Sequence, residues 1–114
     1  MQISKQIKPL SVNDAWKGRR FKTEEYKAYE KQLLLTLPRL KIPPPPYQIY
    51  FEFGFSSCAS DWDNPIKPLQ DILCTKYGFK DKDIYDAIIR KRIVAKGEDY
   101  FFVEIKTLSE TFDS

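Results

Sequence analysis

A nine-residue alternation at residues 47–55, YQIYFEFGF, constrains the fold of this chain more than any other feature. Every second residue in it is large and apolar, which is the period of a strand with one buried face. The buried face is expected to carry Tyr47, Ile49, Phe51, Phe53 and Phe55, and the other face Gln48, Tyr50, Glu52 and Gly54. The predicted strand leads directly into an acidic segment that begins at residue 61.

Two other segments have helical periodicity. Thr23 can cap a helix over residues 24–37, whose first turn is acidic and which a proline ends. Its apolar stripe is Tyr26, Tyr29, Leu33 and Leu37. A second helix is expected to begin with Asn64 as N-cap and Pro65 in the first position, and to close at Gly78. Its buried side is expected to be Ile66, Leu69, Ile72, Leu73 and Tyr77.

The remaining segments complete the predicted fold. Residues 2–8 alternate weakly and suit an edge strand, and the proline-rich residues 39–46 read as a stiff spacer. Two β-rich runs, 84–94 and 99–107, flank the turn AKGE and predict a hairpin. We therefore expect one α/β domain over residues 1–114, with a mixed four-stranded sheet packed against two main helices. The expected order is strand, helix, strand, helix, strand, strand.

Composition excludes several classes of function. The chain has no histidine, which removes Ser-His-Asp and Cys-His nucleophile systems, HNH-type nucleases and histidine-containing zinc sites. Cys58 and Cys74 lack CxxC spacing, so inert thiols are expected. No segment has the length of a membrane span, and the N-terminal MQISKQIKPL lacks the apolar core of a signal peptide. These features favour a cytoplasmic protein.

Asp61 and Asp63 are the first candidates for catalytic or metal-binding residues. Their two-residue spacing would point both carboxylates the same way if the segment stayed extended. Two converging carboxylates repel each other unless a cation lies between them, and magnesium takes one or two carboxylates with water and phosphate oxygens. Asp81 or Asp83, after the second helix, could return a third carboxylate to the same place.

A purely structural interpretation stands beside this one. Asp61 and Asp63 could be turn and capping residues, since aspartate is common before a helix. Lys67, one turn into the helix, could be an ordinary surface lysine, or it could reach back toward a phosphate or an attacking water. Asp71, four residues further on, suits a salt-bridge partner for Lys67.

Net charge is only +3, so the distribution of basic residues matters more than their sum. One cluster lies in a short segment and comprises Lys17, Arg19, Arg20 and Lys22, and another comprises Arg90, Lys91 and Arg92. Either cluster could serve solubility alone. Beside an acidic metal site, the same clusters would suit a DNA backbone, which makes Lys17, Arg19, Arg20, Lys22, Lys67, Arg90 and Lys91 the candidate nucleic-acid contacts.

The acidic segment resembles a known family. DWDNPIKPLQDIL is similar to the Asp-x-Asp-Asn-x-x-Lys-x-x-x-Asp-x-Leu core of the RusA-like Holliday-junction resolvases, small endodeoxyribonucleases of bacteria and their prophages. PLSVNDAW resembles the family's Pro-x-Ser-x-Asn segment, and RRFKTEEYKAYEKQL its Arg, Thr and Tyr-x-x-Tyr pattern. DKDIYDAIIRKRI resembles its strand start before a basic run. The resemblance spans nearly the whole chain.

The resemblance implies catalytic roles for Asp61, Asp63, Lys67 and Asp81, with magnesium or manganese held by the three aspartates. Asp81 is placed by its spacing to Ile84. The family usually has two adjacent aspartates in this loop where this chain has KDKD, so Asp83 is the alternative. It further implies a homodimer that cuts a four-way junction by paired symmetric nicks in DNA recombination and repair, with no nucleotide cofactor.

Two other functions remain open from the sequence. One is a metal nuclease with a looser preference for branched DNA. The other is a non-catalytic DNA-binding or phage-interaction protein on the same scaffold, against which the intact Asp61, Asp63 and Lys67 argue, because a pure binder gains nothing from carboxylates that face phosphates.

Overall fold

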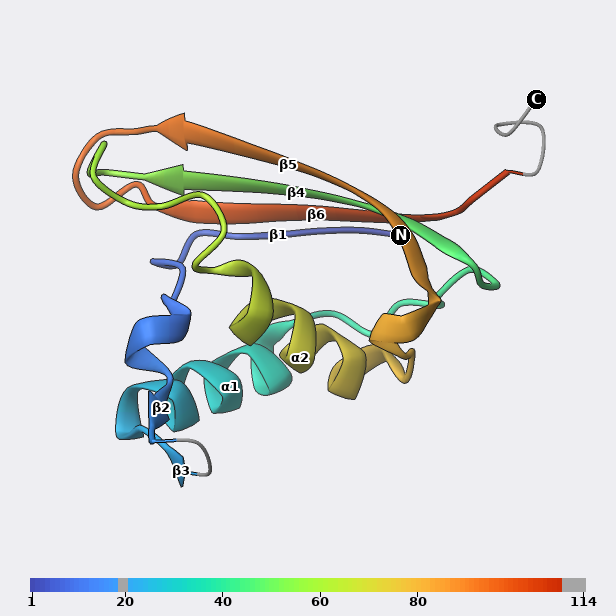
Figure 1. Cartoon of the computed structure of the whole chain (residues 1–114), viewed down its shortest axis with the longest axis horizontal. Helices are drawn as coiled ribbons and strands as arrows, with labels where there is room; N and C mark the ends of the chain where they lie inside the picture. Colours follow the sequence, from blue (N-terminus) through green and yellow to red (C-terminus); the bar gives the residue numbers. More distant parts are fainter. Residues whose placement is uncertain (19–20, 110–114) are drawn as a thin grey trace.

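Strand β4 (Tyr47–Phe55) lies inside a four-stranded sheet of order β1-β6-β4-β5 (Figure 1). The computed structural model describes residues 1–18 and 21–109. In it β4 runs antiparallel to β6 (Tyr100–Thr107) and parallel to β5 (Ile84–Ile93). β1 (Gln2–Lys5) pairs with β6 at one edge, as expected for that segment. The prediction of a mixed sheet with two helices is confirmed.

The predicted hairpin between the last two strands is wrong, because β4 lies between β5 and β6. The turn itself forms, with the Glu98 amide donating to the Ala95 carbonyl at 3.0 Å, but the chain crosses the end of β4 instead of folding back. There the Val94 amide donates to the Phe55 carbonyl at 2.8 Å. A true hairpin would leave β4, whose Phe53 is fully buried, at the edge of the sheet.

The two helices cover one face of the sheet (Figure 1). Helix α1 (Glu24–Thr36) begins as predicted, with the Thr23 side chain accepting a hydrogen bond from the Tyr26 amide. Helix α2 (Ile66–Tyr77) closes at Gly78, whose φ of 72° is the left-handed conformation that glycine adopts without strain.

The start of α2 differs from the prediction. Pro65 occupies the capping position and Asn64 precedes it, so no side chain caps the helix. Asn64 serves the packing between segments instead. Its carbonyl accepts from the Val12 amide at 2.8 Å, which ties the start of α2 to the N-terminal segment.

The N-terminal connection holds short elements that the sequence pattern did not indicate. A 3₁₀ turn, η1 (Val12–Asp14), precedes a two-stranded ribbon of β2 (Trp16–Lys17) and β3 (Phe21–Lys22). A second 3₁₀ turn, η2 (Asp81–Asp83), leads into β5. In the part of the chain that the structure describes, no helix has the length and apolar character needed to cross a membrane.

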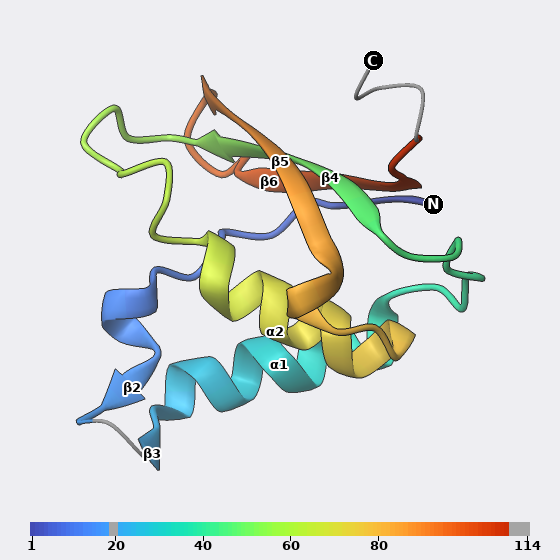
Figure 2. The ribbon, with the colours of Figure 1, turned by 45° about the vertical axis from the view of Figure 1, so that its right-hand side comes forward.

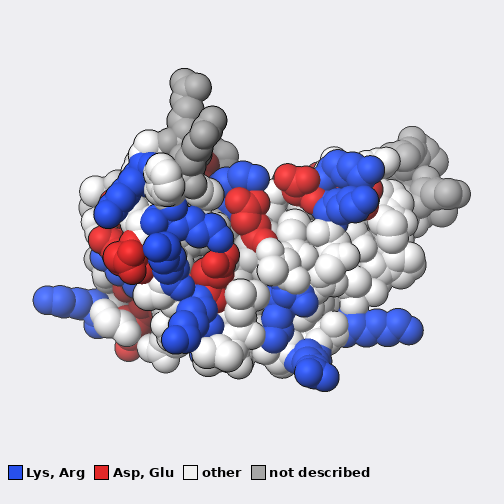
Figure 3. Space-filling model, turned by 90° about the horizontal axis from the view of Figure 1, so that it is seen from below, with Lys and Arg blue, Asp and Glu red and all other residues white. Residues whose placement is uncertain are grey.

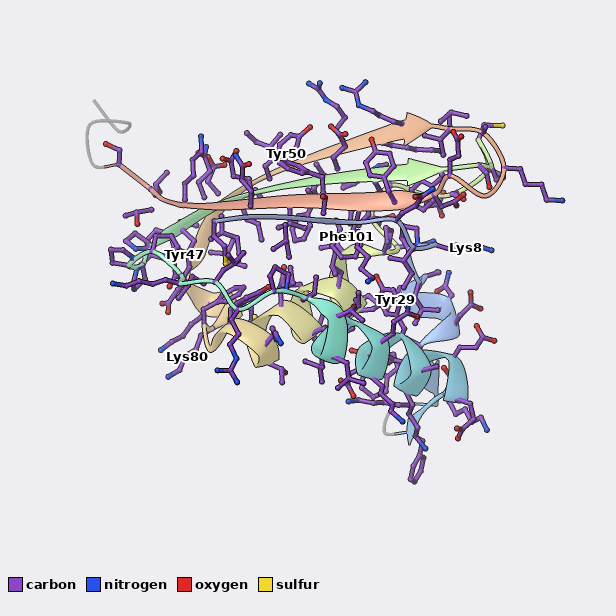
Figure 4. The ribbon with its side chains drawn as sticks, turned by 180° about the vertical axis from the view of Figure 1, so that it is seen from behind. Lys8, Tyr29, Tyr47, Tyr50, Lys80 and Phe101 are labelled. Carbon is purple, nitrogen blue, oxygen red and sulfur yellow. The ribbon has the colours of Figure 1, made fainter. Side chains whose placement is uncertain are left out.

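The core lies between the sheet and the helices. The predicted buried face of β4 is confirmed: all five of its alternating apolar residues are buried, among them Tyr47, Phe51 and Phe55. Figure 4 shows Tyr47 and Phe101 on the helix side of the sheet and Tyr50 on the opposite side, which no helix covers. The sheet therefore has one face in the core and one face open.

Candidate functional site

The loop between β4 and α2, residues 56–65, carries the acidic segment out past the end of the sheet (Figure 2). The chain bends at Trp62 and Asp63 instead of continuing as a strand. The two-residue spacing of Asp61 and Asp63 therefore does not align their carboxylates in the way that an extended segment would. Both aspartates lie on the surface.

Lys91 of β5 supports this loop from the sheet. Its ammonium group donates to the carbonyl of Cys58 at 2.9 Å and also to the carbonyl of Ser60. Trp62, Ala87, Ile89 and Lys91 together line a shallow hollow on the inner side of β5. Lys91 was predicted as a DNA contact, but in this structure its charged group binds the carbonyls that directly precede Asp61.

The two motif aspartates have different surroundings. One carboxylate oxygen of Asp61 accepts a hydrogen bond from the Asn64 side-chain amide at 3.2 Å, and Asp61 lines a cavity beside α1. The carboxylate of Asp63 has no hydrogen bond or ion pair with any described residue. Asp63 is therefore a free, exposed carboxylate at the start of α2.

Lys67 of α2 connects two further carboxylates. Its ammonium nitrogen lies 2.9 Å from an oxygen of Asp71, one turn along the helix, and 3.9 Å from an oxygen of Asp81 in η2. The hydrogen bond with Asp71 is the main cause that raises the pKa of Lys67, and Asp81 contributes to the rise. Of the two alternatives after the helix, Asp81 is the one that reaches Lys67.

Cys74 lies in the same groove between α2 and η2, together with Asp71, Thr75 and Asp81. Burial is the main cause that raises the pKa of its thiol to about 11, and the nearby Asp81 and Asp71 carboxylates add to the rise. The thiol is thus protonated at neutral pH, as expected for an inert cysteine. Cys58 is exposed, and neither cysteine forms a disulfide.

The donor chemistry of Asp61, Asp63 and Asp81 suits a hard divalent cation, because carboxylate oxygens are the ligands that magnesium prefers. Their positions do not form a finished site. Among residues 1–18 and 21–109, no three carboxylate or thiol side chains lie close enough together to hold one metal ion. All three aspartates are exposed, and the carboxylate of Asp81 faces an ammonium group.

The predicted basic contacts lie in separate parts of the molecule. Lys67 and Lys91 are near the aspartates, Lys67 through its ion pair with Asp81 and Lys91 through the Ser60 carbonyl that precedes Asp61. The β2–β3 ribbon that carries Lys17 and Lys22 lies below the helices (Figure 1). The ammonium nitrogen of Lys22 forms an ion pair with a carboxylate oxygen of Glu30 at 2.8 Å, while Arg90 is exposed on β5. Figure 3 shows basic and acidic side chains interleaved over the helix side of the molecule. Arg19 and Arg20 lie outside the described residues.

Comparisons of the sequence with protein-family models and with curated proteins found no match. The function proposed below therefore depends on the geometry of this site and on the motif resemblance in the sequence. What sequence reasoning missed is the support from Lys91 and the cavity that Asp61 borders. Both involve residues that are far apart in the chain, so no local pattern could have indicated them.

Proposed function

We propose that the protein is a magnesium-dependent endodeoxyribonuclease that resolves Holliday junctions, of the RusA-like kind. The observation that carries the proposal is the ion pair between Lys67 and Asp81. It brings the lysine of the acidic motif close to the aspartate that follows the helix. A centre that cleaves phosphodiesters would need both side chains at the same phosphate.

The roles follow from the chemistry of the side chains. Lys67 is exposed on α2, and from there its ammonium group can offset the negative charge that develops on a phosphate during cleavage. Asp71 holds that ammonium group in place by a hydrogen bond of 2.9 Å. Lys91 fixes the backbone that presents Asp61.

Asp61, Asp63 and Asp81 would hold the metal ion. Magnesium or manganese supplies Lewis-acid activation of the phosphate and of water. Since the ammonium group of Lys67 lies 3.9 Å from one carboxylate oxygen of Asp81, a metal ion bound by that oxygen would compete with the ion pair. The exposed side chains have room to rearrange when phosphate and cation arrive together.

A four-way junction needs two nicks, and each chain has one candidate centre, so the proposal includes a two-fold homodimer. The sheet face that no helix covers offers a small apolar patch for it, beside the ion pair of Glu52 and Arg92. Ile88 is 47% exposed there, next to the Tyr50 and Phe102 rings, which contact each other edge to face at 5.9 Å. We expect this dimer to work in the cytoplasm, where bacterial and phage DNA recombine.

A metal nuclease with a looser preference for branched DNA is the second candidate, because the same aspartates and lysine would serve it. A test of both uses purified protein with magnesium on synthetic four-way, three-way and linear duplex DNA, and Asp63→Asn as the inactive control. Paired symmetric nicks confined to the four-way junction support the resolvase. Equal cleavage of every branched DNA supports the looser nuclease. If neither magnesium nor manganese allows any cleavage, the proposal fails.

A further inference from the structure

Strand β5 forms one edge of the sheet, and its outer side has no neighbouring strand. It comes last in the strand order β1-β6-β4-β5 and lies at the upper edge of the sheet in Figure 1. Among the described residues, none forms a backbone hydrogen bond with the outer side of β5. The strand is 10 residues long, from Ile84 to Ile93. A long unpaired edge of this kind is a template for pairing with another chain.

The side chains of β5 alternate between the two faces of the sheet. Asp86, Ile88 and Arg90 pair in register with β4 residues of the open face, so these three side chains lie on that face too. Ala87 and Ile89 pair with buried β4 residues and therefore lie on the helix side. The middle of the open side is apolar and accessible, because Ile88 is 47% exposed.

Two charged side chains on the open side of β5 have no ion pair with any described residue. They are Asp86 and Arg90. Asp86 accepts a hydrogen bond from the neutral side chain of Gln48 at 2.9 Å, which leaves its negative charge without a cation. By contrast, Arg92 further along the strand pairs with Glu52 at 3.3 Å. The strand thus offers one free negative charge and one free positive charge, placed symmetrically about its middle.

We propose that β5 pairs antiparallel with β5 of a second copy of this chain, about a two-fold axis through Ile88. In this register Ile88 lies beside the partner's Ile88, and Asp86 lies opposite the partner's Arg90. Two ion pairs would therefore flank one apolar contact on the open face. On the helix side, Ala87 would lie opposite the partner's Ile89, which adds a second apolar contact.

The registers on either side of this one fit less well. An axis through Asp86 or Arg90 would bring like charges directly opposite each other, which is destabilising. An axis through Ile89 would set Ile88 against Arg90, and an axis through Ala87 would set Asp86 against Ile88. Of these registers, the one centred on Ile88 alone matches apolar with apolar and negative with positive.

This pairing places both candidate centres on one face of the dimer. The two sheets would join into one continuous sheet with the two-fold axis perpendicular to it. Both helix layers then lie on the same side, and with them the two ion pairs of Lys67 and Asp81. The inference deepens the proposed function, on whose homodimer it rests. Stacking through the open face alone would instead point the two helix layers in opposite directions.

Light scattering on the full chain at micromolar concentration, without DNA or metal, tests the pairing. The wild type should be a dimer. Asp86→Arg and Arg90→Asp should each raise the dissociation constant by at least about tenfold, because like charges then face each other. An equimolar mixture of the two variants should dimerise again, since every facing pair then has opposite charges. The control Lys106→Asp, on exposed Lys106 of β6, should leave the dimer intact.

A cysteine cross-link tests the register independently, in a Cys58→Ser background that removes the exposed native thiol. Ile88→Cys should form a disulfide-linked dimer under mild oxidation, because directly opposite residues have Cα atoms about 4.5–5.5 Å apart. Tyr85→Cys is the control, since Tyr85 is 69% exposed but would face the partner's Lys91. It should not cross-link. Circular dichroism checks that each variant is folded.

Three results would overturn the proposal. They are a wild type that stays monomeric, a mixture of folded charge variants that fails to dimerise, and equal cross-linking at both cysteine positions. A monomeric wild type would leave the edge to an extended segment of another protein. Failure here is distinguishable from failure of the nuclease proposal. A charge-dependent dimer that cleaves no DNA would support the pairing and remove the nuclease. Junction cleavage by a dimer that both charge changes leave intact would do the reverse.

Discussion

The ammonium group of Lys67 lies 3.9 Å from the carboxylate of Asp81, although the rest of helix α2 and the turn after it separate these residues in sequence. The contact forms because η2 brings the chain back alongside α2 before β5 begins (Figure 2). It joins the lysine of the acidic motif to an aspartate that follows the helix.

Replacing Lys67 by methionine should slow junction cleavage by about 100-fold or more, because the change removes a positive charge at the phosphate. Stability should change by less than about 1 kcal/mol, since Lys67 forms exposed ion pairs. Single-turnover cleavage and urea denaturation give the two quantities. The control is Lys82→Met in η2, which should cleave normally. Equal rates in the two variants would return Lys67 to the role of a surface lysine.

Ile88→Asp should convert the proposed dimer into monomers, because it places a charge within an apolar contact. The matched change is Leu35→Asp on α1, another exposed apolar residue, which should leave the assembly intact. Light scattering at micromolar concentration measures the mass. A wild-type protein that is already monomeric would remove the paired-nick mechanism, and a dimeric Ile88→Asp would move the interface elsewhere.

The Glu52 carboxyl group should make the folding stability depend on pH. Hydrogen bonds from Tyr100 and Tyr50, each 2.6 Å long, lower its pKa in the folded state. A carboxyl with a lowered pKa contributes stability above its unfolded value of 4.5, and this contribution is lost as pH falls through the folded value. Glu52→Gln should therefore cost about 1–3 kcal/mol at pH 7 and lose less than wild type on acidification. Urea denaturation of wild type and Glu52→Gln, at pH 7 and at acidic pH, measures the free energies of unfolding. An equal loss of stability in the two proteins on acidification would contradict the prediction.

The two cysteines should react at very different rates. With a pKa of about 11, the Cys74 thiol is ionised to only about one part in a thousand at pH 8. Exposed Cys58 should take up iodoacetamide first, and in Cys58→Ser the labelling of Cys74 should accelerate about tenfold for each unit between pH 8 and pH 10. Rapid labelling of Cys74 at pH 8 would show that the groove between α2 and η2 is open.

Local patterns predicted much of the fold. The alternation in residues 47–55 gave the strand and its buried face, because only one face of β4 meets the helices. Thr23 and Gly78 marked helix ends because their capping chemistry is local. The prediction that β5 pairs with β6 was wrong. Which strands become neighbours in the sheet depends on where the most buried strand lies, and the residues of the turn between β5 and β6 carry no information about that.

The candidate site was predictable only in part. The motif named Lys67 and Asp81 as candidates, but it could show neither that their charged groups lie 3.9 Å apart nor that Asp61 lines a cavity together with Asp14 and Tyr29. That cavity depends on how three distant segments pack together. The same packing explains why Lys91 supports a loop, although its place in a basic run suggested DNA binding.

Cleavage of a four-way junction by Asp81→Asn and Asp83→Asn, each compared with wild type in magnesium, tests the account most directly. The two residues share η2, but only Asp81 forms an ion pair with Lys67. We predict a loss of at least about 100-fold in single-turnover rate for Asp81→Asn with junction binding retained, and a rate within about threefold of wild type for Asp83→Asn. An Asp81→Asn protein that cleaves within a few-fold of wild type would contradict the proposed centre, as would equal losses in both variants.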